Sequence, residues 1–358
     1  MSLDQYCITY YTVVFCAYCI QYVTRLGRNQ KKQIIFCILI SIGLSLFIGA
    51  RNPDIGTDTA QYYWKAKYGA RFLKEALEKI EFGEDPIYYI CLTYIGKIWG
   101  PKWALTCVCL VTNLIFLRFT YLLCRDNGIA NYTRVFIYVL TTFCCFNMET
   151  NIIRNGVAVP IMMISLYWFS KRNIVRGVIV GLIAISCHFT TIILIVIYLM
   201  ILYLKPSQKL CNYAFFIAMG LSAVGISMLS FGVFENFDLR ATDAYVQVQK
   251  YSDYQMGFRP TFVAFNTIFW AFFMYARKRV NSPMYDLMLK YYTLASALFF
   301  LWQALPFNDR MGLYSWIVIP FLLAPAIAQF RKKLPLSGEV TFLLYFVMCF
   351  YLAYKHTV

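Results

Sequence analysis

Charged residues are scarce in this chain, and acidic residues are the scarcer kind. Of its 358 residues 14% are charged, with 17 Asp and Glu against 33 Lys and Arg, whereas 60% are hydrophobic. A typical soluble domain has about 25% charged residues and a smaller apolar share. The shortage of charge therefore excludes an ordinary soluble domain, and we infer that lipid is the solvent for most of the chain.

Several catalytic signatures are also missing. The sequence contains no P-loop, no DxD motif for a metal-bound sugar nucleotide, no HExxH motif and no credible Ser-His-Asp pattern. Nucleotide-driven transport, metal-dependent transfer from nucleotide sugars and proteolysis are therefore disfavoured. The 13 Cys follow no metal-type spacing, and nearly all lie in apolar runs where Cys acts as a small hydrophobe. We expect no disulfide, no metal and no cofactor.

Long apolar runs are what the sequence has in abundance. Several contain about 17 or more nearly uncharged residues, enough to cross a bilayer as a helix. They predict an all-α, polytopic membrane protein with about twelve spans, forming a single integral domain over residues 1–358. The first run is interpreted as a retained span and not as a signal peptide. The candidate spans cover about residues 6–23, 33–50, 104–123, 133–149, 152–170, 174–187, 189–204, 211–231, 261–276, 285–305, 311–330 and 340–354.

Basic residues cluster in the short linkers between these runs. In a soluble protein the net charge of +16 would suggest a nucleic-acid partner, but here the clusters contain no acid and read as cytoplasmic topology signals. They lie at residues 25–32, 171–176, 205–209, 277–279 and 331–333. Alternation then places segments 51–103 and 232–260 outside, as a periplasmic polar cap. The apolar stretch 86–99 conflicts with this alternation, so we predict that it is a re-entrant or interfacial helix.

Four polar constellations fall on the predicted external boundary. The first follows the second apolar run, where Arg51, Asp54, Gly56, Asp58 and Tyr62 offer a guanidinium, two carboxylates and a glycine that permits close backbone approach. This set suits the binding of a phosphate together with a sugar. The alternative is that the arginine only snorkels to the interface and that the Asn-Pro-Asp segment is only a turn.

The second constellation lies where two apolar runs meet and contains Glu149, Arg154 and Asn155. Arginine at membrane depth is costly unless it faces a polar cavity or a partner, so Arg154 is a candidate site residue. The alternative is a structural ion pair between Glu149 and Arg154.

The third constellation interrupts an apolar stretch of about 28 residues, which is too long for one crossing and short for two. We predict a helix break at His188, because freed backbone groups in a membrane are tolerated only where they face a protein cavity. The imidazole of His188 can also exchange a proton near neutral pH. The alternative is a buried histidine that is satisfied by hydrogen bonds.

The fourth constellation is a short external connection that holds Asn308, Asp309 and Arg310. Its alternative interpretation is a capped turn with a local ion pair. The segment 232–260 is rich in Asp, Tyr and Gln, which suits a carbohydrate groove, and it adds Arg240 and Arg259 as candidate substrate ligands.

Taken together, these elements resemble the EpsG/Wzy group of bacterial polysaccharide polymerases. That group is similar in turn to O-antigen ligases and other lipid-linked glycosyltransferases of the GT-C type. The elements that carry the resemblance, in order along most of the chain, are Arg51 with Gly56-Thr57-Asp58 and Tyr62, Glu84 to Tyr88, Arg154-Asn155-Gly156-Val157-Ala158, His188-Phe189-Thr190 and Asp309-Arg310.

The resemblance implies a GT-C-like helical fold and an enzyme of the bacterial inner membrane. It would join repeat units carried on undecaprenyl pyrophosphate into O-antigen or a related polysaccharide at the periplasmic face, without a metal. Its partners would be lipid-linked glycans and membrane lipid, with a chain-length regulator and a flippase as candidates. On this hypothesis, the catalytic candidates are His188, Asp58 and Glu149, the pyrophosphate ligands are Arg51, Arg154 and Arg310, and the other substrate ligands are Asp54, Tyr62, Asn155, Asp309, Arg240 and Arg259.

Three other classes of function remain as alternatives. A flippase for the same lipid-linked oligosaccharide would also need many spans and a cationic cavity, although its cationic groups would be expected along the midplane. A scaffold in a polysaccharide export complex would leave the boundary arginines and His188 without a common role. An acyltransferase that modifies surface sugars is a more distant enzyme class.

Overall fold

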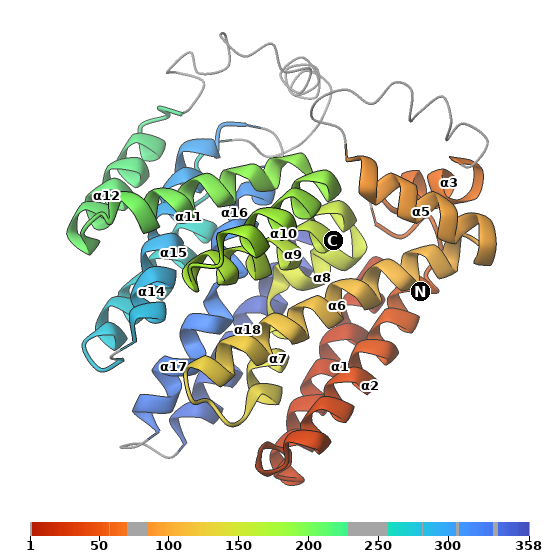
Figure 1. The fold of residues 1–358 in the computed structure, drawn as a ribbon, viewed down its shortest axis with the longest axis horizontal. Coiled ribbons are helices and arrows are strands. Elements are labelled where there is room, and N and C mark those ends of the chain that lie inside the picture. Colours follow the sequence, from red (N-terminus) through yellow and green to blue (C-terminus); the bar gives the residue numbers. More distant parts are fainter. Residues whose placement is uncertain are drawn as a thin grey trace. The chain divides into compact units, whose positions relative to one another are not determined.

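The computed structural model describes residues 2–56, 58–69, 85–227, 257–280, 282–305, 308–331 and 336–357. Every regular element in these ranges is a helix, as Figure 1 shows. The predicted all-α class is therefore confirmed for the part of the chain that the structure describes.

The chain divides into two compact units. Unit 1 comprises residues 1–195 and 327–358, and unit 2 comprises residues 196–326. The helices that lie in unit 1 are α1 (Leu3–Val23), η1 (Leu26–Arg28), α2 (Gln30–Gly49), α3 (Thr59–Tyr68), α5 (Pro86–Trp99), α6 (Pro101–Asp126), α7 (Tyr132–Thr141), α8 (Phe143–Thr150), α9 (Ile153–Ser170), α10 (Ile174–Cys187), η3 (Phe189–Thr191) and α18 (Ser337–Thr357). Those of unit 2 are α12 (Gln208–Ala223), α14 (Pro260–Arg277), α15 (Pro283–Trp302) and α16 (Asp309–Trp316), while α11 (Ile192–Leu204) and α17 (Ile319–Phe330) contribute residues to both units.

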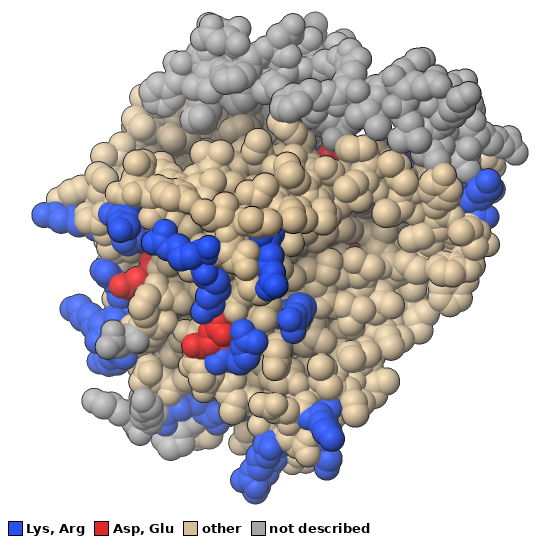
Figure 2. All heavy atoms as spheres, viewed as in Figure 1, with Lys and Arg blue, Asp and Glu red and all other residues tan. Residues whose placement is uncertain are grey.

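Five helical segments among the described residues are long and apolar enough to cross a bilayer. They are Leu3–Val23, Gln30–Gly49, Pro101–Asp126, Asp309–Phe330 and Ser337–Lys355. On the face drawn in Figure 2, most of the described surface carries no charge, and Lys and Arg outnumber Asp and Glu. The protein is thus a helical, membrane-embedded chain, whereas the count of about twelve spans stays a prediction.

Two of the predicted interruptions form as expected. Helix α10 ends at Cys187, His188 has an extended backbone with φ −160° and ψ 112°, and η3 follows directly, so the predicted break at His188 is confirmed. The segment 86–99 is a helix with the predicted bounds. Its placement in or on the membrane remains a prediction.

One predicted run is interrupted in the structure at a position that the apolar pattern does not indicate. The stretch 133–149 was expected to be continuous, but α7 ends at Thr141 and α8 begins at Phe143. Between them Thr142 has φ −58° and ψ 127°, and its hydroxyl lies 2.6 Å from the Tyr345 hydroxyl and 3.1 Å from the Tyr138 carbonyl oxygen. A side-chain partner from α18 therefore accompanies a break that periodicity alone does not predict.

The long helix α6 is the centre of unit 1. It packs against α2, α3, α5, α7 and α9, and α9 in turn packs against α10. In Figure 1 the red and orange helices α1, α2 and α6 follow one another side by side. An apolar core that includes Tyr88, Leu92, Leu105, Ala158 and Cys187 joins α5, α6, α9 and α10.

A buried side-chain amide links three helices of unit 2. The side-chain oxygen Oδ1 of Asn266 on α14 accepts hydrogen bonds from the Ser296 hydroxyl on α15 at 2.9 Å and from the Ser315 hydroxyl on α16 at 3.2 Å. Its amide nitrogen donates to the Phe262 carbonyl oxygen at 3.0 Å. A polar side chain that is buried among membrane helices needs such hydrogen bonds within the protein, because neither lipid nor the apolar core offers a partner.

Candidate functional site

A buried carboxylate collects three donors from distant parts of unit 1. Asp85 is only 2% exposed, and its Oδ2 accepts from Nη1 of Arg154 at 2.6 Å and lies 3.1 Å from Nδ1 of His188. Its Oδ1 accepts from the backbone N–H of Phe189 at 2.9 Å. We call Asp85, Arg154, His188 and Tyr62 the acid–imidazole cluster, because the Arg154 Nε also donates to the Tyr62 hydroxyl at 3.1 Å.

Three of the four members, Asp85, Arg154 and His188, lie at the end of a helix or at a break. Asp85 is the N-cap residue of α5, with Pro86 at the first helical position, but its carboxylate makes no capping hydrogen bond and turns to the cluster instead. Arg154 lies in the first turn of α9. His188 lies at the break after α10, where its own carbonyl oxygen accepts from the Thr191 hydroxyl at 2.7 Å. The packing of α5 and α9 on α10 brings these three positions together.

The surroundings of Asp85 favour its ionised form. Burial raises the pKa of Asp85, but the hydrogen bond and charge of His188 and the charge of Arg154 together outweigh burial and lower the pKa below its usual range. The carboxylate is therefore ionised at neutral pH and can only accept hydrogen bonds. Nδ1 of His188 is then the donor of this hydrogen bond, and in a neutral imidazole with that tautomer the lone pair lies on Nε2.

The cluster is more open at its arginine than at its acid. The Arg154 side chain is 28% exposed, whereas that of Asp85 is 2% exposed. Tyr62 is buried and packs edge-on against Tyr88, with their ring centroids 5.7 Å apart. Arg154 thus has a more exposed side chain than Asp85 or Tyr62, and Asp85 holds its guanidinium in a fixed orientation.

Arg51 occupies a separate, closed position in unit 1. Its side chain is fully buried and donates to the Ile48 carbonyl oxygen at 2.8 Å, to the Thr59 hydroxyl at 3.0 Å and to the Thr150 carbonyl oxygen at 3.0 Å. The snorkelling alternative for Arg51 is therefore wrong. These bonds tie the end of α2 and the start of α3 to the end of α8.

The loop after Arg51 is pressed against the same region. Gly56 has φ +93°, and a Cβ at this position would lie 2.6 Å from Oδ1 of Asn151. The close backbone approach that the sequence predicted at Gly56 is thus to another part of this chain. Of the two acids in the loop, Asp54 is exposed, and Asp58 is half-buried at the N-cap position of α3.

Glu149 and Asn155 are buried, with exposed fractions of 1% and 3%. Neither carboxylate oxygen of Glu149 accepts a hydrogen bond from any residue that the structure describes, although Asn113 and Arg51 are its polar neighbours. Arg154 forms its ion pair with Asp85, so the alternative of a Glu149–Arg154 pair is wrong.

The candidates from the late part of the chain belong to unit 2. The backbone N–H of Arg259 donates to the Gln303 side-chain oxygen at 2.9 Å, and its Nη1 donates to Oδ1 of Asn308 at 3.3 Å. Asp309 and Arg310 form the first turn of α16. Arg240 lies outside the described residues.

Of the residues predicted from sequence, the structure brings together Tyr62, Arg154 and His188. Sequence reasoning missed Asp85, which lies 69 positions before Arg154 and 103 before His188. An acid directly before a proline at a helix start has an ordinary interpretation as a cap, so its local pattern did not distinguish it. Within the described ranges, no group of three or more His, Cys, Asp or Glu is placed to hold a metal ion.

Comparison with known proteins identifies the family. The model of the EpsG family matches residues 33–358, which is most of the chain, and so the chain belongs to the EpsG family. Members of this family are Wzy-like polymerases, which gives the chain a polysaccharide polymerase-type role in the membrane. No curated protein and no solved structure matches the chain.

Proposed function

Because the chain belongs to the EpsG family, we propose that it polymerises oligosaccharide repeat units carried on undecaprenyl pyrophosphate. The proposed setting is the periplasmic face of the bacterial inner membrane, where nucleotide donors are absent and the activated donor must itself be lipid-linked. The product would be O-antigen or a related surface polysaccharide. A flippase and a chain-length regulator are the proposed protein partners.

The single observation that carries the proposal is the acid–imidazole cluster. It combines a proton acceptor, a carboxylate that orients it, and a partly exposed arginine. Glycosyl transfer between lipid-linked chains needs such a set, because an acceptor hydroxyl must lose a proton while a pyrophosphate leaves. No metal is required for either step in the reaction that we propose.

The reaction would proceed by displacement at the anomeric carbon of the donor chain. The acceptor hydroxyl oxygen forms the new C–O bond as the C–O bond to undecaprenyl pyrophosphate breaks and its electron pair stays with the pyrophosphate. Nε2 of His188 takes the hydroxyl proton, and the resulting imidazolium is stabilised by ionised Asp85. Arg154 stabilises the charge that develops on the leaving pyrophosphate. Direct in-line attack would invert the anomeric configuration.

The other candidate site residues have different roles in this proposal. Arg51 has its donors bonded within the chain, which supports a positioning role for the loop 51–58. Glu149 is buried beside Arg51, so Asp58 is the stronger of the two alternative bases. Arg310 would bind pyrophosphate. The other proposed glycan ligands are Asp54, Asn155, Asp309, Arg240 and Arg259.

The test replaces Arg51, Arg154, His188 and Arg310 singly with Gln in cells that depend on this chain, and the surface-polysaccharide ladder is read. Arg118→Gln is the matched control, because Arg118 is exposed on α6 and lies outside the cluster. We expect single lipid-linked repeats to accumulate in the Arg154 and His188 variants while the protein stays abundant in the membrane. Long chains in both of these variants would refute the cluster as the site. Failure of the repeats to reach the periplasm would favour a flippase.

A further inference from the structure

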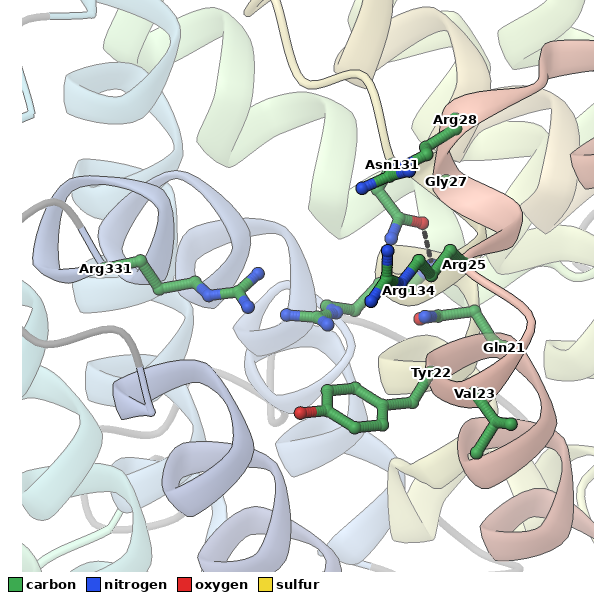
Figure 3. A pocket seen from close by; sticks show the side chains of 9 residues that line it. All are labelled: Gln21, Tyr22, Val23, Arg25, Gly27, Arg28, Asn131, Arg134 and Arg331. Atoms are coloured by element: carbon green, nitrogen blue, oxygen red, sulfur yellow. Dashed lines mark hydrogen bonds between the residues drawn. The ribbon is translucent and has the colours of Figure 1, made fainter.

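A basic pocket lies in unit 1, apart from the acid–imidazole cluster. Its volume is about 660 Å³, and among the described residues its lining contains four arginines and no acid. These are Arg25 and Arg28 from the turn after α1, Arg134 from α7 and Arg331 at the end of α17. In Figure 3 the guanidinium groups of Arg134 and Arg331 point toward one another across the pocket.

The positive charge of this pocket is only partly compensated. One carboxylate oxygen, Oε1 of Glu339, accepts from Arg134 at 3.3 Å and from Arg331 at 3.0 Å. Nε and Nη1 of Arg134 are buried and have no hydrogen-bond partner among the described residues, although the side chain is only 11% exposed. Arg25 and Arg28 are exposed and pair with no described acid. Four guanidinium groups around one cavity, with a single carboxylate bonded to two of them, favour an anion with several acceptor oxygens.

The walls of the pocket are tied together without a ligand. The side-chain amide of Gln33 on α2 donates to the Gly27 carbonyl oxygen at 3.2 Å and to the Ala130 carbonyl oxygen at 3.0 Å. The turn that carries Arg25 and Arg28 is therefore fixed to the segment that precedes α7. Asn131 caps α7 by accepting from the Arg134 backbone N–H at 3.1 Å, which sets the direction of the first turn of that helix.

The place of the pocket indicates the source of the anion. Tyr22 and Val23, the last residues of the candidate span α1, line the pocket and are exposed. Arg331 directly follows another candidate span. A cavity at the ends of two spans lies at headgroup depth, and the positive-inside rule predicts that this end is cytoplasmic, where membranes present anionic lipids.

We propose that this pocket binds the phosphate headgroup of an anionic membrane lipid on the cytoplasmic side, a site that is independent of glycosyl transfer. The exposed guanidinium groups of Arg25 and Arg28 would hold the phosphate oxygens, Arg134 and Arg331 would add positive charge, and the exposed end of α1 would lie along the first part of an acyl chain. Free inorganic phosphate shares the headgroup chemistry but would gain nothing from Tyr22 and Val23.

The test measures binding to the full chain in a neutral detergent by calorimetric titration. The probes are dioctanoyl phosphatidylglycerol, dioctanoyl phosphatidylcholine and inorganic phosphate. We expect the first to bind most tightly and to bind about tenfold more weakly to Arg25→Gln and to Arg28→Gln, because each loses a charge-assisted hydrogen bond. Both arginines are exposed, so the variants should fold.

Arg176→Gln is the matched control, since Arg176 is an exposed arginine of another predicted cytoplasmic linker. Unchanged binding in that variant is expected. Equal binding to the wild type and to both pocket variants would overturn the proposal. Equal affinity for the phosphatidylglycerol and phosphatidylcholine probes would also overturn it, and inorganic phosphate binding as tightly as the anionic lipid would exclude a lipid as the preferred occupant.

Discussion

Replacing Asp85 with Asn separates the charge of the cluster from its shape. The amide keeps nearly the same volume at a position that is 2% exposed, but it removes the negative charge that faces His188 and Arg154. A hydrogen bond to a charged group contributes about 1.5–3 kcal/mol. If the bond to His188 strengthens as the imidazole takes up a proton, its loss lowers the rate of glycosyl transfer by about 10- to 150-fold.

The same change has a cost in stability, which the assay must separate from catalysis. Arg154 loses a buried partner, and breaking a buried ion pair costs up to about 3–5 kcal/mol, less where one side chain keeps contact with solvent. Arg154 is 28% exposed, so we expect a loss at the low end of that range. The thermal unfolding midpoint of the purified variant measures it, and Asp54→Asn, at an exposed acid of the same unit, is the control.

The decisive readout for Asp85→Asn is the pH profile of the rate per folded molecule, measured in single turnover with a lipid-linked repeat unit. Without the carboxylate the imidazolium of His188 is less stable, so the base loses its proton at a lower pH. The acidic limb of the rate profile should therefore shift to lower pH. If Asp85 had only a structural role, Asp85→Asn would lower the amount of folded enzyme and leave the acidic limb of the profile at the same pH. A folded variant with the wild-type rate and profile would refute the reasoning.

Three further outcomes follow from the same contacts. Arg154→Lys keeps the charge but loses the planar fork that bonds Asp85 and Tyr62 together, and should lower the transfer rate by about tenfold or more while membrane abundance is retained. Gly56→Ala should lower the free energy of unfolding by about 1–3 kcal/mol, and with it the unfolding midpoint, because φ +93° and the nearby Asn151 side chain disfavour a Cβ. The rate per folded molecule should change little. The pKa of Asp85 is lower in the folded protein than in the unfolded chain, where it is about 4. The ionised carboxylate therefore stabilises the fold above about pH 4, and this stabilisation is lost as the pH falls through the folded-state pKa. The difference in unfolding free energy between wild type and Asp85→Asn should be constant from about pH 5 to 8 and shrink in stronger acid.

Much of the helical framework could be predicted from apolar length alone. The break at His188 followed from a run that was too long for one span, and the helix 86–99 followed from its apolar content and from its conflict with the alternation of the basic linkers. The break at Thr142 could not be predicted in this way. It coincides with a hydroxyl contact to Tyr345, which is 203 residues away in the sequence.

The ion-pair partner of Arg154 could not be predicted from the sequence either. From sequence, the nearby Glu149 was the obvious acid, but the packing of α5 against α10 places Asp85 there instead. Local periodicity predicts which residues lie at helix ends, and it carries no information on which ends meet. Arginines and a histidine in apolar surroundings were recognisable because their burial is costly, whereas an acid before a proline was not.

The most direct measurement uses the purified chain in liposomes with one undecaprenyl-pyrophosphate-linked repeat unit and no other protein. The account predicts that chains lengthen, that one undecaprenyl pyrophosphate is released for each bond formed, and that His188→Gln slows this by about a hundredfold or more, the usual contribution of a general base. Passage of intact repeat units across the bilayer without lengthening, or lengthening at the wild-type rate in folded His188→Gln, would contradict it.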